Sequence, residues 1–237
     1  MHKTNNTISI VLFIIGAIIG ILFNAMALWP DYEASLFNSG LDADEGMGSL
    51  RCPILINDHE HGLVRASVTN PLDRNFKPDV RASISQGYVT LMRQSDQTPL
   101  LAPGETQNLQ WTVNPEDAAW KRVILFRAYQ FRAYPVPSRT GACGILVVNI
   151  SIPGSGLTIL WVAASLLLMG TGMWLWVRGN QPLIYPSRNV VSAMTAMGIV
   201  VLAGIASALA ALMVVGLITL VVSILMSLAM LAHFTHS

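Results

Sequence analysis

Hydrophobic and polar positions follow two different patterns along the chain. Residues 8–29, 157–177 and 190–234 form long and almost wholly apolar stretches, whereas residues 51–150 contain short runs of period two separated by turn residues. Long unbroken apolar stretches are typical of membrane-spanning helices. Period-two runs are typical of half-buried strands. The pattern therefore predicts apolar helices on both sides of a β-domain.

The first apolar stretch, Ile8–Trp29, carries no charge and is long enough to cross a hydrocarbon core about 30 Å thick. A cleaved signal peptide is the alternative, because His2 and Lys3 precede the stretch and Ala25-Met26-Ala27 resembles a cleavage site. The length of the run favours a retained anchor. Residues 1–30 are therefore assigned to a cytoplasmic amino terminus and a first transmembrane helix.

The later stretches predict three more spans. Residues 154–178 form the second, with Trp161 and Trp174 near its ends, where indole rings favour the membrane interface. After a loop at 179–189, a single helix over Val190–Phe234 would extend about 67 Å, which is too long for a bilayer. Residues 190–237 therefore predict the third and fourth spans, joined near Met213–Gly216, with a re-entrant segment as the alternative.

Loop charges predict the orientation of the spans. Lys3, Arg178 and Arg188 fall on one side if four spans alternate, and basic loops stay in the cytoplasm. We expect a multi-pass protein of the cell membrane with both termini cytoplasmic and residues 31–153 extracytoplasmic. Its acidic segment, residues 31–50, is expected to be a solvated linker.

Composition narrows the possible partners. The chain has 53% hydrophobic and 11% charged residues, against about 25% charged in soluble domains. Between residues 31 and 153, 13 acidic side chains outnumber 11 basic ones, which leaves no basic stripe for nucleic acid. The expected partners are the lipid bilayer and other membrane protein subunits, with no cofactor.

Residues 51–153 are expected to form an immunoglobulin-like all-β sandwich inserted between the first two helices. Seven short strands at intervals of about 8 to 15 residues are typical of that fold. The strands expected are Cys52–Ile56, Leu63–Thr69, Asp79–Ser85, Tyr88–Arg93, Thr106–Val113, Val123–Gln130 and Cys143–Asn149.

A longer motif within this region resembles a known class of module. The segment VTNPLDRNFKPDVRASIS, followed by LLAPGETQNLQWTV and a long hydrophobic strand, is similar to bacterial immunoglobulin-like modules of the CARDB and NEW3 type. Those modules are adhesive domains or spacers on surface and secreted proteins. The resemblance implies a fold and an extracytoplasmic location, and it carries over no catalytic residue.

The two cysteines both fall in the extracytoplasmic segment, on the first and last expected strands. An oxidising compartment favours a Cys52–Cys143 disulfide with a structural role, with two unpaired thiols as the alternative. In antibody-type domains the cysteines instead sit on central strands around a tryptophan.

Two polar segments are candidates for chemistry or binding. His59 and His61 could present two imidazoles on one side of a strand or turn, but no second cluster completes a tetrahedral metal site, so a polar turn is the favoured interpretation. The segment 129–139 alternates aromatic residues with arginines, which are favoured in interfaces. The possible partner contacts are Tyr129, Phe131, Arg132, Tyr134 and Arg139, and a rigid connection is the alternative.

The apolar stretches 8–29, 157–177 and 190–234 contain no Asp, Glu, Lys or Arg, which argues against a pump or a coupled transporter. The sequence combines membrane anchors and a folded domain with no convergent polar site, so we expect no enzyme, but an accessory subunit of a membrane complex or a surface binding module. The alternative is a small membrane enzyme or transport component with a site where sandwich and membrane meet. A claudin-like adhesion protein ranks lower, because its tryptophan and paired-cysteine signature is missing from the first loop.

Overall fold

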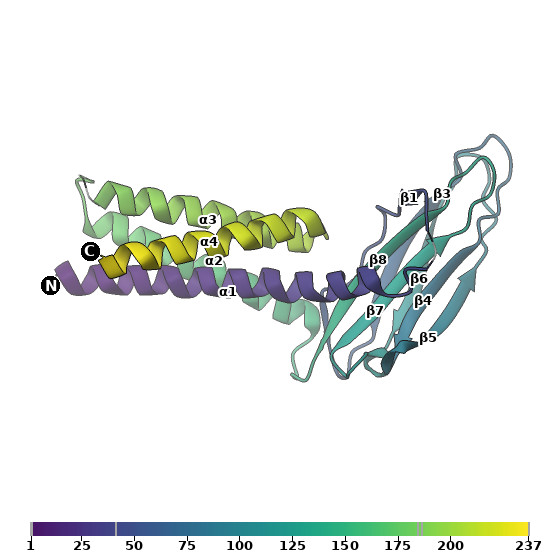
Figure 1. Cartoon of the computed structure of the whole chain (residues 1–237), viewed down its shortest axis with the longest axis horizontal. Helices are drawn as coiled ribbons and strands as arrows, with labels where there is room; N and C mark the ends of the chain where they lie inside the picture. Colours follow the sequence, from purple (N-terminus) through teal and green to yellow (C-terminus); the bar gives the residue numbers. More distant parts are fainter. Residues whose placement is uncertain (1, 41, 184, 186, 237) are drawn as a thin grey trace. The chain divides into compact units, whose positions relative to one another are not determined.

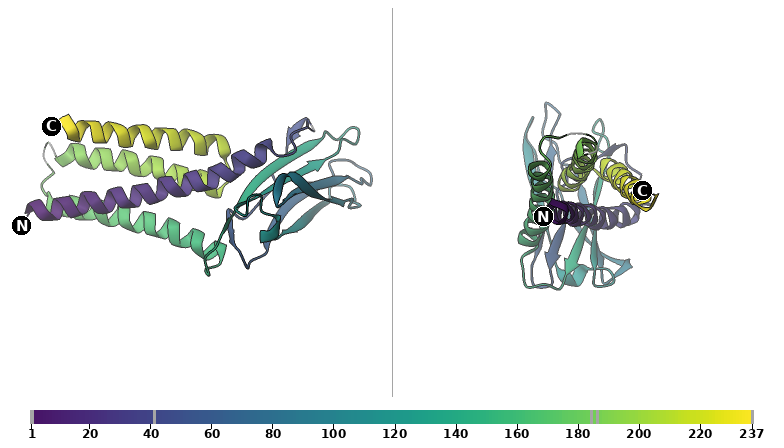
Figure 2. Two further views of the ribbon diagram at one scale, coloured as in Figure 1. Left: turned by 60° about the horizontal axis from the view of Figure 1, so that its bottom comes forward. Right: turned by 90° about the vertical axis from the view of Figure 1, so that its left-hand side faces the viewer.

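The computed structural model describes residues 2–40, 42–183, 185 and 187–236 (Figure 1). These residues form two compact units: a helical unit from Met1–Leu28 and Leu157–Ser237, and a β-domain from Trp29–Gly156. Helix α1 (His2–Leu36) contributes residues to both units (Figure 2).

The β-domain consists of two sheets. The larger has the strand order β1-β8-β7-β4-β5, with β2 also paired to β8, and the smaller consists of β3 and β6. Strands β1 and β2 run parallel to β8, whereas the other pairs are antiparallel. The elements are β1 (Glu45–Gly46), β2 (Leu55–Asn57), β3 (Gly62–Thr69), β4 (Val80–Gln86), β5 (Tyr88–Gln97), β6 (Thr106–Val113), the 3-10 helix η1 (Pro115–Asp117), β7 (Val123–Gln130) and β8 (Arg139–Val148).

Strand register defines two ends of this domain. Gly62 lies opposite Val113 and Val123 lies opposite Leu146, so the loops 58–61, 114–122 and 149–153 share one end. The chain continues from there into α2, and we call it the α2 end. The loops 70–79, 98–105 and 131–138 form the opposite end, which we call the far end.

The core lies between the two sheets. Alternate residues of β3 are buried, and so are Leu109, Trp111 and Val113 on β6. They pack against Ile84 and Phe126 of the larger sheet, and the rings of Trp111 and Phe126 have centroids 5.5 Å apart. The predicted strand periodicity and the two-sheet, immunoglobulin-like arrangement are therefore confirmed.

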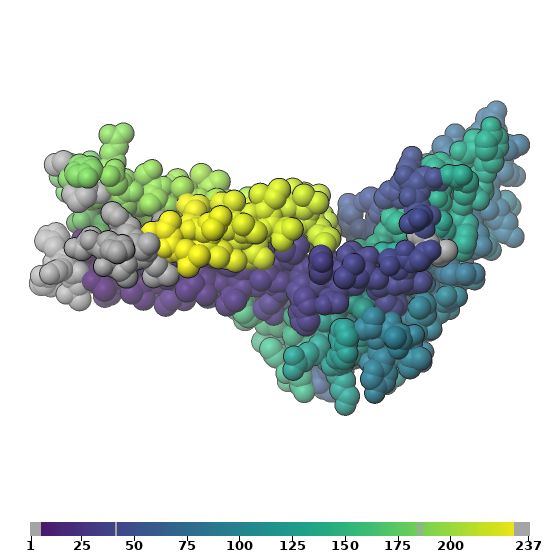
Figure 3. Space-filling view, viewed as in Figure 1, coloured from purple at the N-terminus to yellow at the C-terminus, as the bar shows by residue number. Residues whose placement is uncertain are grey.

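Strand β7 is buried on both faces. Its residues from Val123 to Ala128 are all buried, although alternate positions point away from the core. The last turns of α1 cover that outer face, and Ala34 and Phe37 are themselves buried there. Figure 3 shows residues 29–40 lying on the outer surface of the strands.

The helical unit also contains α2 (Gly154–Gly179), α3 (Ser187–Leu209) and α4 (Met213–His236). In the described part of the chain, three helical segments have the length and apolar composition to cross a membrane: Asn6–Leu36, Gly154–Gly179 and Ser187–Leu209. The segment Met213–Ala229 of α4 is apolar but shorter. The predicted helices are therefore present, and the turn between the last two lies at residues 210–212 rather than at Met213–Gly216.

The expectation of a solvated linker at residues 31–50 is wrong for two parts of that segment. Residues 31–36 continue α1, because they pack on the outer face of β7 and β8. Residues 45–46 form β1, because they pair with the start of β8.

Candidate functional site

The predicted contact loop lies at the far end of the β-domain. Tyr129 and Arg139 belong to β7 and β8, while Phe131, Arg132 and Tyr134 lie in the connection between these strands. Residues 42–46, which we call the acidic hook, run beside this connection, because β1 pairs with β8. The loop and the hook therefore form one structure.

The charged side chains of loop and hook bind one another. Arg132 makes a two-pronged ion pair with Asp44, and Nε of Arg139 lies 2.9 Å from Oε2 of Glu45. Asp44 also accepts hydrogen bonds from the hydroxyl and the N–H of Ser138, at 2.6 and 2.9 Å. The hydrogen bonds from Ser138, followed by that from Arg132, lower the pKa of Asp44 to about 2. The two arginines therefore hold the loop to the hook.

The aromatic side chains of the loop divide into two groups. The Tyr129 hydroxyl donates to the carbonyl of Asp42 at 3.0 Å. The Phe131 ring packs edge-on against Tyr129 and lies 5.2 Å from the guanidinium of Arg81. Tyr134, in contrast, is 91% exposed. Of the five predicted contact residues, Tyr134 is thus the one turned almost wholly to solvent.

The histidine-containing turn lies at the α2 end, and its two imidazoles have different partners. Nε2 of His59 lies 3.6 Å from a carboxylate oxygen of Asp58, while Nδ1 of His61 lies 2.9 Å from the side-chain oxygen of Asn114. Within the described residues, no group of three or more His, Cys, Asp and Glu side chains is placed to hold a metal ion.

Glu60 of the same turn fastens the β-domain to the first residue of α2. Its Oε2 accepts hydrogen bonds from the N–H of Gly154 at 2.7 Å and from the N–H of Asn57 at 3.4 Å. A carboxylate at a helix amino terminus satisfies an N–H that has no partner within the helix and interacts favourably with the helix dipole. The role of this carboxylate is therefore to position the start of α2.

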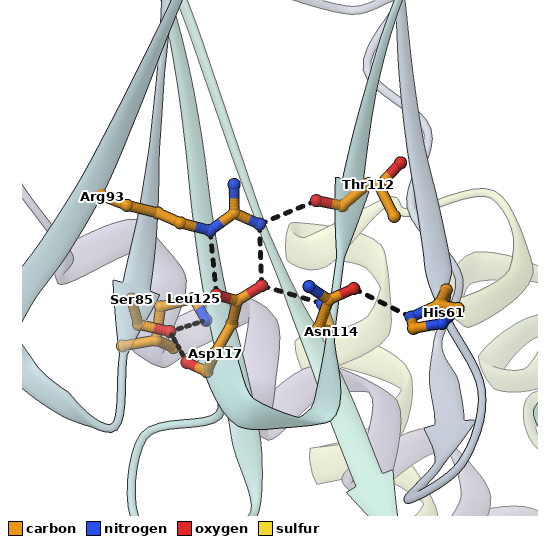
Figure 4. Close-up of polar contacts among 7 residues, drawn as sticks. All are labelled: His61, Ser85, Arg93, Thr112, Asn114, Asp117 and Leu125. Carbon is orange, nitrogen blue, oxygen red and sulfur yellow. Dashed lines mark hydrogen bonds and ion pairs between the residues drawn. The ribbon is translucent and has the colours of Figure 1, made fainter.

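A second polar network at the α2 end was not anticipated from the sequence (Figure 4). The buried carboxylate of Asp117 accepts hydrogen bonds from Nε and Nη2 of Arg93, at 2.9 and 2.8 Å, and from the N–H of Asn114 at 2.8 Å. The Ser85 hydroxyl donates to the carbonyl of Asp117 and accepts an N–H of β7. The pKa of Arg93 is raised by its hydrogen bond to Asp117. Nη2 of Arg93 also donates to the carbonyl of Thr112 on β6 at 2.7 Å, so the network joins β4, β5, β6, η1 and β7.

The predicted disulfide is present between Cys52 and Cys143, whose Cα atoms are 6.5 Å apart. Cys143 lies on β8, as expected, but Cys52 precedes β2, which begins only at Leu55. The bond therefore joins β8 to the segment that precedes β2.

The end of α1 is bound to the larger sheet by groups that sequence reasoning missed. A carboxylate oxygen of Asp31 accepts the N–H of Gly144 at 2.9 Å. The guanidinium of Arg127 donates to the carbonyls of Ser35 and Asn38, at 2.6 and 3.1 Å, and so caps the helix carboxyl terminus. Burial lowers the pKa of Arg127. The single sequence signal was the run Val123–Phe126, whose continuous apolar character is typical of a strand buried on both faces.

The helical unit is joined by polar groups and small residues. Nδ2 of Asn24 donates to the carbonyl of Gly216 and to the hydroxyl of Thr219, at 3.1 and 3.3 Å, and so links α1 to α4. The Ser165 hydroxyl donates to the carbonyl of Gly16 at 2.8 Å, which links α2 to α1. Small residues at such positions let helix backbones approach closely.

An apolar hollow of about 600 Å³ lies among α1, α3 and α4. Its lining within the described residues is predominantly aliphatic and includes Phe13, Ile14, Met194, Met197 and Ser227. Such a lining suits a hydrocarbon chain or an apolar side chain and offers no ionisable group for catalysis.

Comparison with solved structures gives likenesses to part of this chain. No protein-family model and no curated protein matches the chain. A similar solved structure is the CARDB domain of a Pyrococcus furiosus protein in complex with di-metal ions, at 15% identity and a TM-score of 0.33, covering 46% of this chain and 96% of that domain. It is the kind of module that the sequence resembles.

Two enzymes contain similar regions. A Paenibacillus cycloisomaltooligosaccharide glucanotransferase is 15% identical with a TM-score of 0.34, and a β-glucosidase from Erythrobacter marinus is 23% identical with a TM-score of 0.30. The likeness covers 46% and 40% of this chain but only 15% and 14% of those enzymes.

Proposed function

We propose that this chain is a non-enzymatic membrane protein, an accessory subunit or binding module whose helices anchor an extracytoplasmic immunoglobulin-like domain. The proposal rests on what the charged side chains of the β-domain bind. In both clusters singled out from the sequence, charged groups bind one another or the backbone. Arg132 and Arg139 bind the acidic hook, and Glu60 binds the start of α2. This favours a binding role over an enzyme with a site near the membrane.

Membrane anchoring is supported by the three long apolar helices and by the apolar first part of α4. In the proposed topology the chain crosses the membrane four times and both termini are cytoplasmic, which is supported by Arg178 and Arg188 in one loop. The disulfide supports an extracytoplasmic β-domain, since such bonds persist in oxidising compartments. The docking of residues 29–38 on the β-domain favours retention of α1 as an anchor.

The far end supplies the contact surface for a partner subunit. Tyr134 is 91% exposed and Leu100 is 66% exposed, and both lie in far-end loops. Tyrosine is enriched at the centres of protein interfaces because it combines a large apolar ring with a polar tip. The hook holds the Tyr134 loop in one arrangement, which reduces the ordering cost of binding.

In-cell photocrosslinking tests the proposal. A photoreactive phenylalanine analogue at position 134 is expected to crosslink to another membrane protein, whereas the same analogue at Gln107, an exposed position on β6, is expected to give no adduct. A protein that purifies from mild detergent as a monomer and gives no adduct at position 134 would refute the subunit role. Membrane anchoring is tested separately by resistance to alkaline carbonate extraction. The topology is tested by labelling intact cells with an impermeant maleimide, which is expected to react with Tyr134→Cys and not with Asn180→Cys.

A further inference from the structure

The α2 end of the β-domain exposes several large apolar and aromatic side chains close to where the chain enters α2. Tyr88 is 64% exposed and Trp120 is 52% exposed, and Ile150 and Ile152 are exposed on the segment that leads into α2. We call these four residues the rim. Exposing the apolar surface of Trp, Tyr and aliphatic side chains to water is unfavourable. The same side chains suit the boundary between the lipid headgroups and the hydrocarbon.

The backbone holds the aromatic part of the rim together. The N–H of Trp120 donates to the carbonyl of Gly87 at 3.2 Å, so the turn before β7 adjoins the turn that carries Tyr88. Trp120 and Lys121 both have positive φ angles, 52° and 58°, which residues other than glycine rarely adopt. Such conformations persist where the surroundings over-determine them and are concentrated at functional sites.

The end of the β-domain that carries the rim is close in sequence to the apolar part of α2. Glu60 holds the N–H of Gly154, and Leu157 begins the apolar part of α2 three residues later. Three residues of helix rise about 5 Å. The headgroup layer on each side of a bilayer is about 5–8 Å thick. This short chain distance lets the end of the β-domain that carries Glu60 and the rim reach the headgroups when α2 spans a bilayer.

We infer that the rim is a membrane-contact surface, with Trp120, Tyr88, Ile150 and Ile152 resting in the headgroup layer of the outer leaflet. Exposed Lys121 and Arg122 adjoin Trp120 and suit lipid phosphates. The acidic residues of the loops at this end are Asp58, Glu60, Glu116 and Asp117, of which Glu60 binds the N–H of Gly154 and Asp117 binds Arg93. The inference rests on the proposed membrane anchoring and extends it, because it assigns the β-domain itself, and not its helices alone, a contact with lipid.

Depth-dependent quenching tests this contact in the full-length chain. Cys52 and Cys143 are bonded to each other, so a fluorophore can be placed on a single introduced cysteine. The variants are Trp120→Cys and Tyr88→Cys on the rim, with Tyr134→Cys at the far end as the matched control. Each is reconstituted into nanodiscs of phosphatidylcholine and phosphatidylglycerol, with or without a spin label on the lipid headgroup.

The expected result is loss of fluorescence at positions 120 and 88 with the spin-labelled lipid, and unchanged fluorescence at position 134. If the chain enters the nanodisc and the spin-labelled lipid quenches the fluorescence equally at all three positions, or at none, the rim contact is overturned and the anchoring remains intact. A crosslink from position 120 to a protein, without quenching by lipid, would equally overturn it. Failure of the chain to enter nanodiscs would overturn the anchoring and, with it, the rim contact.

Discussion

The docking of α1 on the β-domain depends on the absence of a side chain at Gly144. A Cβ atom at this position would overlap the backbone carbonyl and the ring of Pro30. The substitution Gly144→Ala therefore forces the end of α1 away from the sheet. Because the overlap is with backbone rather than with the tip of a flexible side chain, rotation of a side chain cannot relieve it.

The cost follows from the hydrogen bonds that this movement breaks. One runs from the Gly144 N–H to Asp31, and two run from Arg127 to the carbonyls of Ser35 and Asn38. Hydrogen bonds to charged groups each contribute about 1.5–3 kcal/mol, so losing half of their total strength costs roughly 2–4 kcal/mol. For a domain of this size, that lowers the midpoint of thermal unfolding by about 10 °C.

Two measurements on the full-length protein in detergent test this reasoning. Thermal unfolding of the Gly144→Ala variant is expected to shift downward, and hydrogen exchange is expected to accelerate in residues 30–38. The matched control is Gly46→Ala, because a Cβ atom at that position meets nothing within 4 Å. Exchange in residues 30–38 that matches the wild type, together with an unchanged midpoint, would show that α1 is not held at Gly144.

Three further perturbations probe the rest of the β-domain. Replacing Cys52 and Cys143 by serine removes a covalent link between residues 91 positions apart. The free energy of unfolding is expected to fall by about 4–5 kcal/mol, measured by thermal unfolding, and added reductant should have the same effect on the wild type. Because the pKa of Asp44 is about 2 instead of 3.8, its stabilisation is fully present above pH 3.8 and is lost as the pH falls through about 2. The midpoint difference between wild type and Asp44→Asn should therefore shrink over that range, and a constant difference would contradict the assignment. Arg93→Met leaves the carboxylate of Asp117 buried and is expected to cost about 2–3 kcal/mol by chemical denaturation, less than for a wholly buried pair because the Arg93 side chain is 36% exposed.

Much of the architecture could be predicted from the sequence because it depends on local periodicity. The strands β6 (Thr106–Val113) and β7 (Val123–Gln130) begin and end where the hydrophobic pattern predicted. The apolar helices follow from uninterrupted hydrophobic stretches, which require no knowledge of their neighbours. The disulfide was predictable because the described chain offers one pair of cysteines, both in the same segment.

The candidate site was less predictable, because the sequence identified the residue types but not their partners. Arg132 and Arg139 were predicted only as possible partner contacts, and the structure adds their ion pairs with Asp44 and Glu45, from a segment more than 80 residues away. Tyr134 has the same residue type as Tyr129 and lies in the same segment, yet one is exposed and the other is bound to the hook. Exposure depends on which distant segment covers a side chain.

The sequence by itself determined the chain's division into apolar helices and a β-domain, the strand positions and the cysteine pair, since each depends on residues close together or on a unique pairing. Only the tertiary structure decided that α1 extends onto β7 and β8, that Asp44 and Glu45 of the acidic hook bind Arg132 and Arg139, and that the network of Asp117 and Arg93 joins five elements. These features depend on contacts between residues far apart in sequence. Hydrophobic periodicity carries no record of such contacts, because it reports only which face of an element is buried and not what buries it.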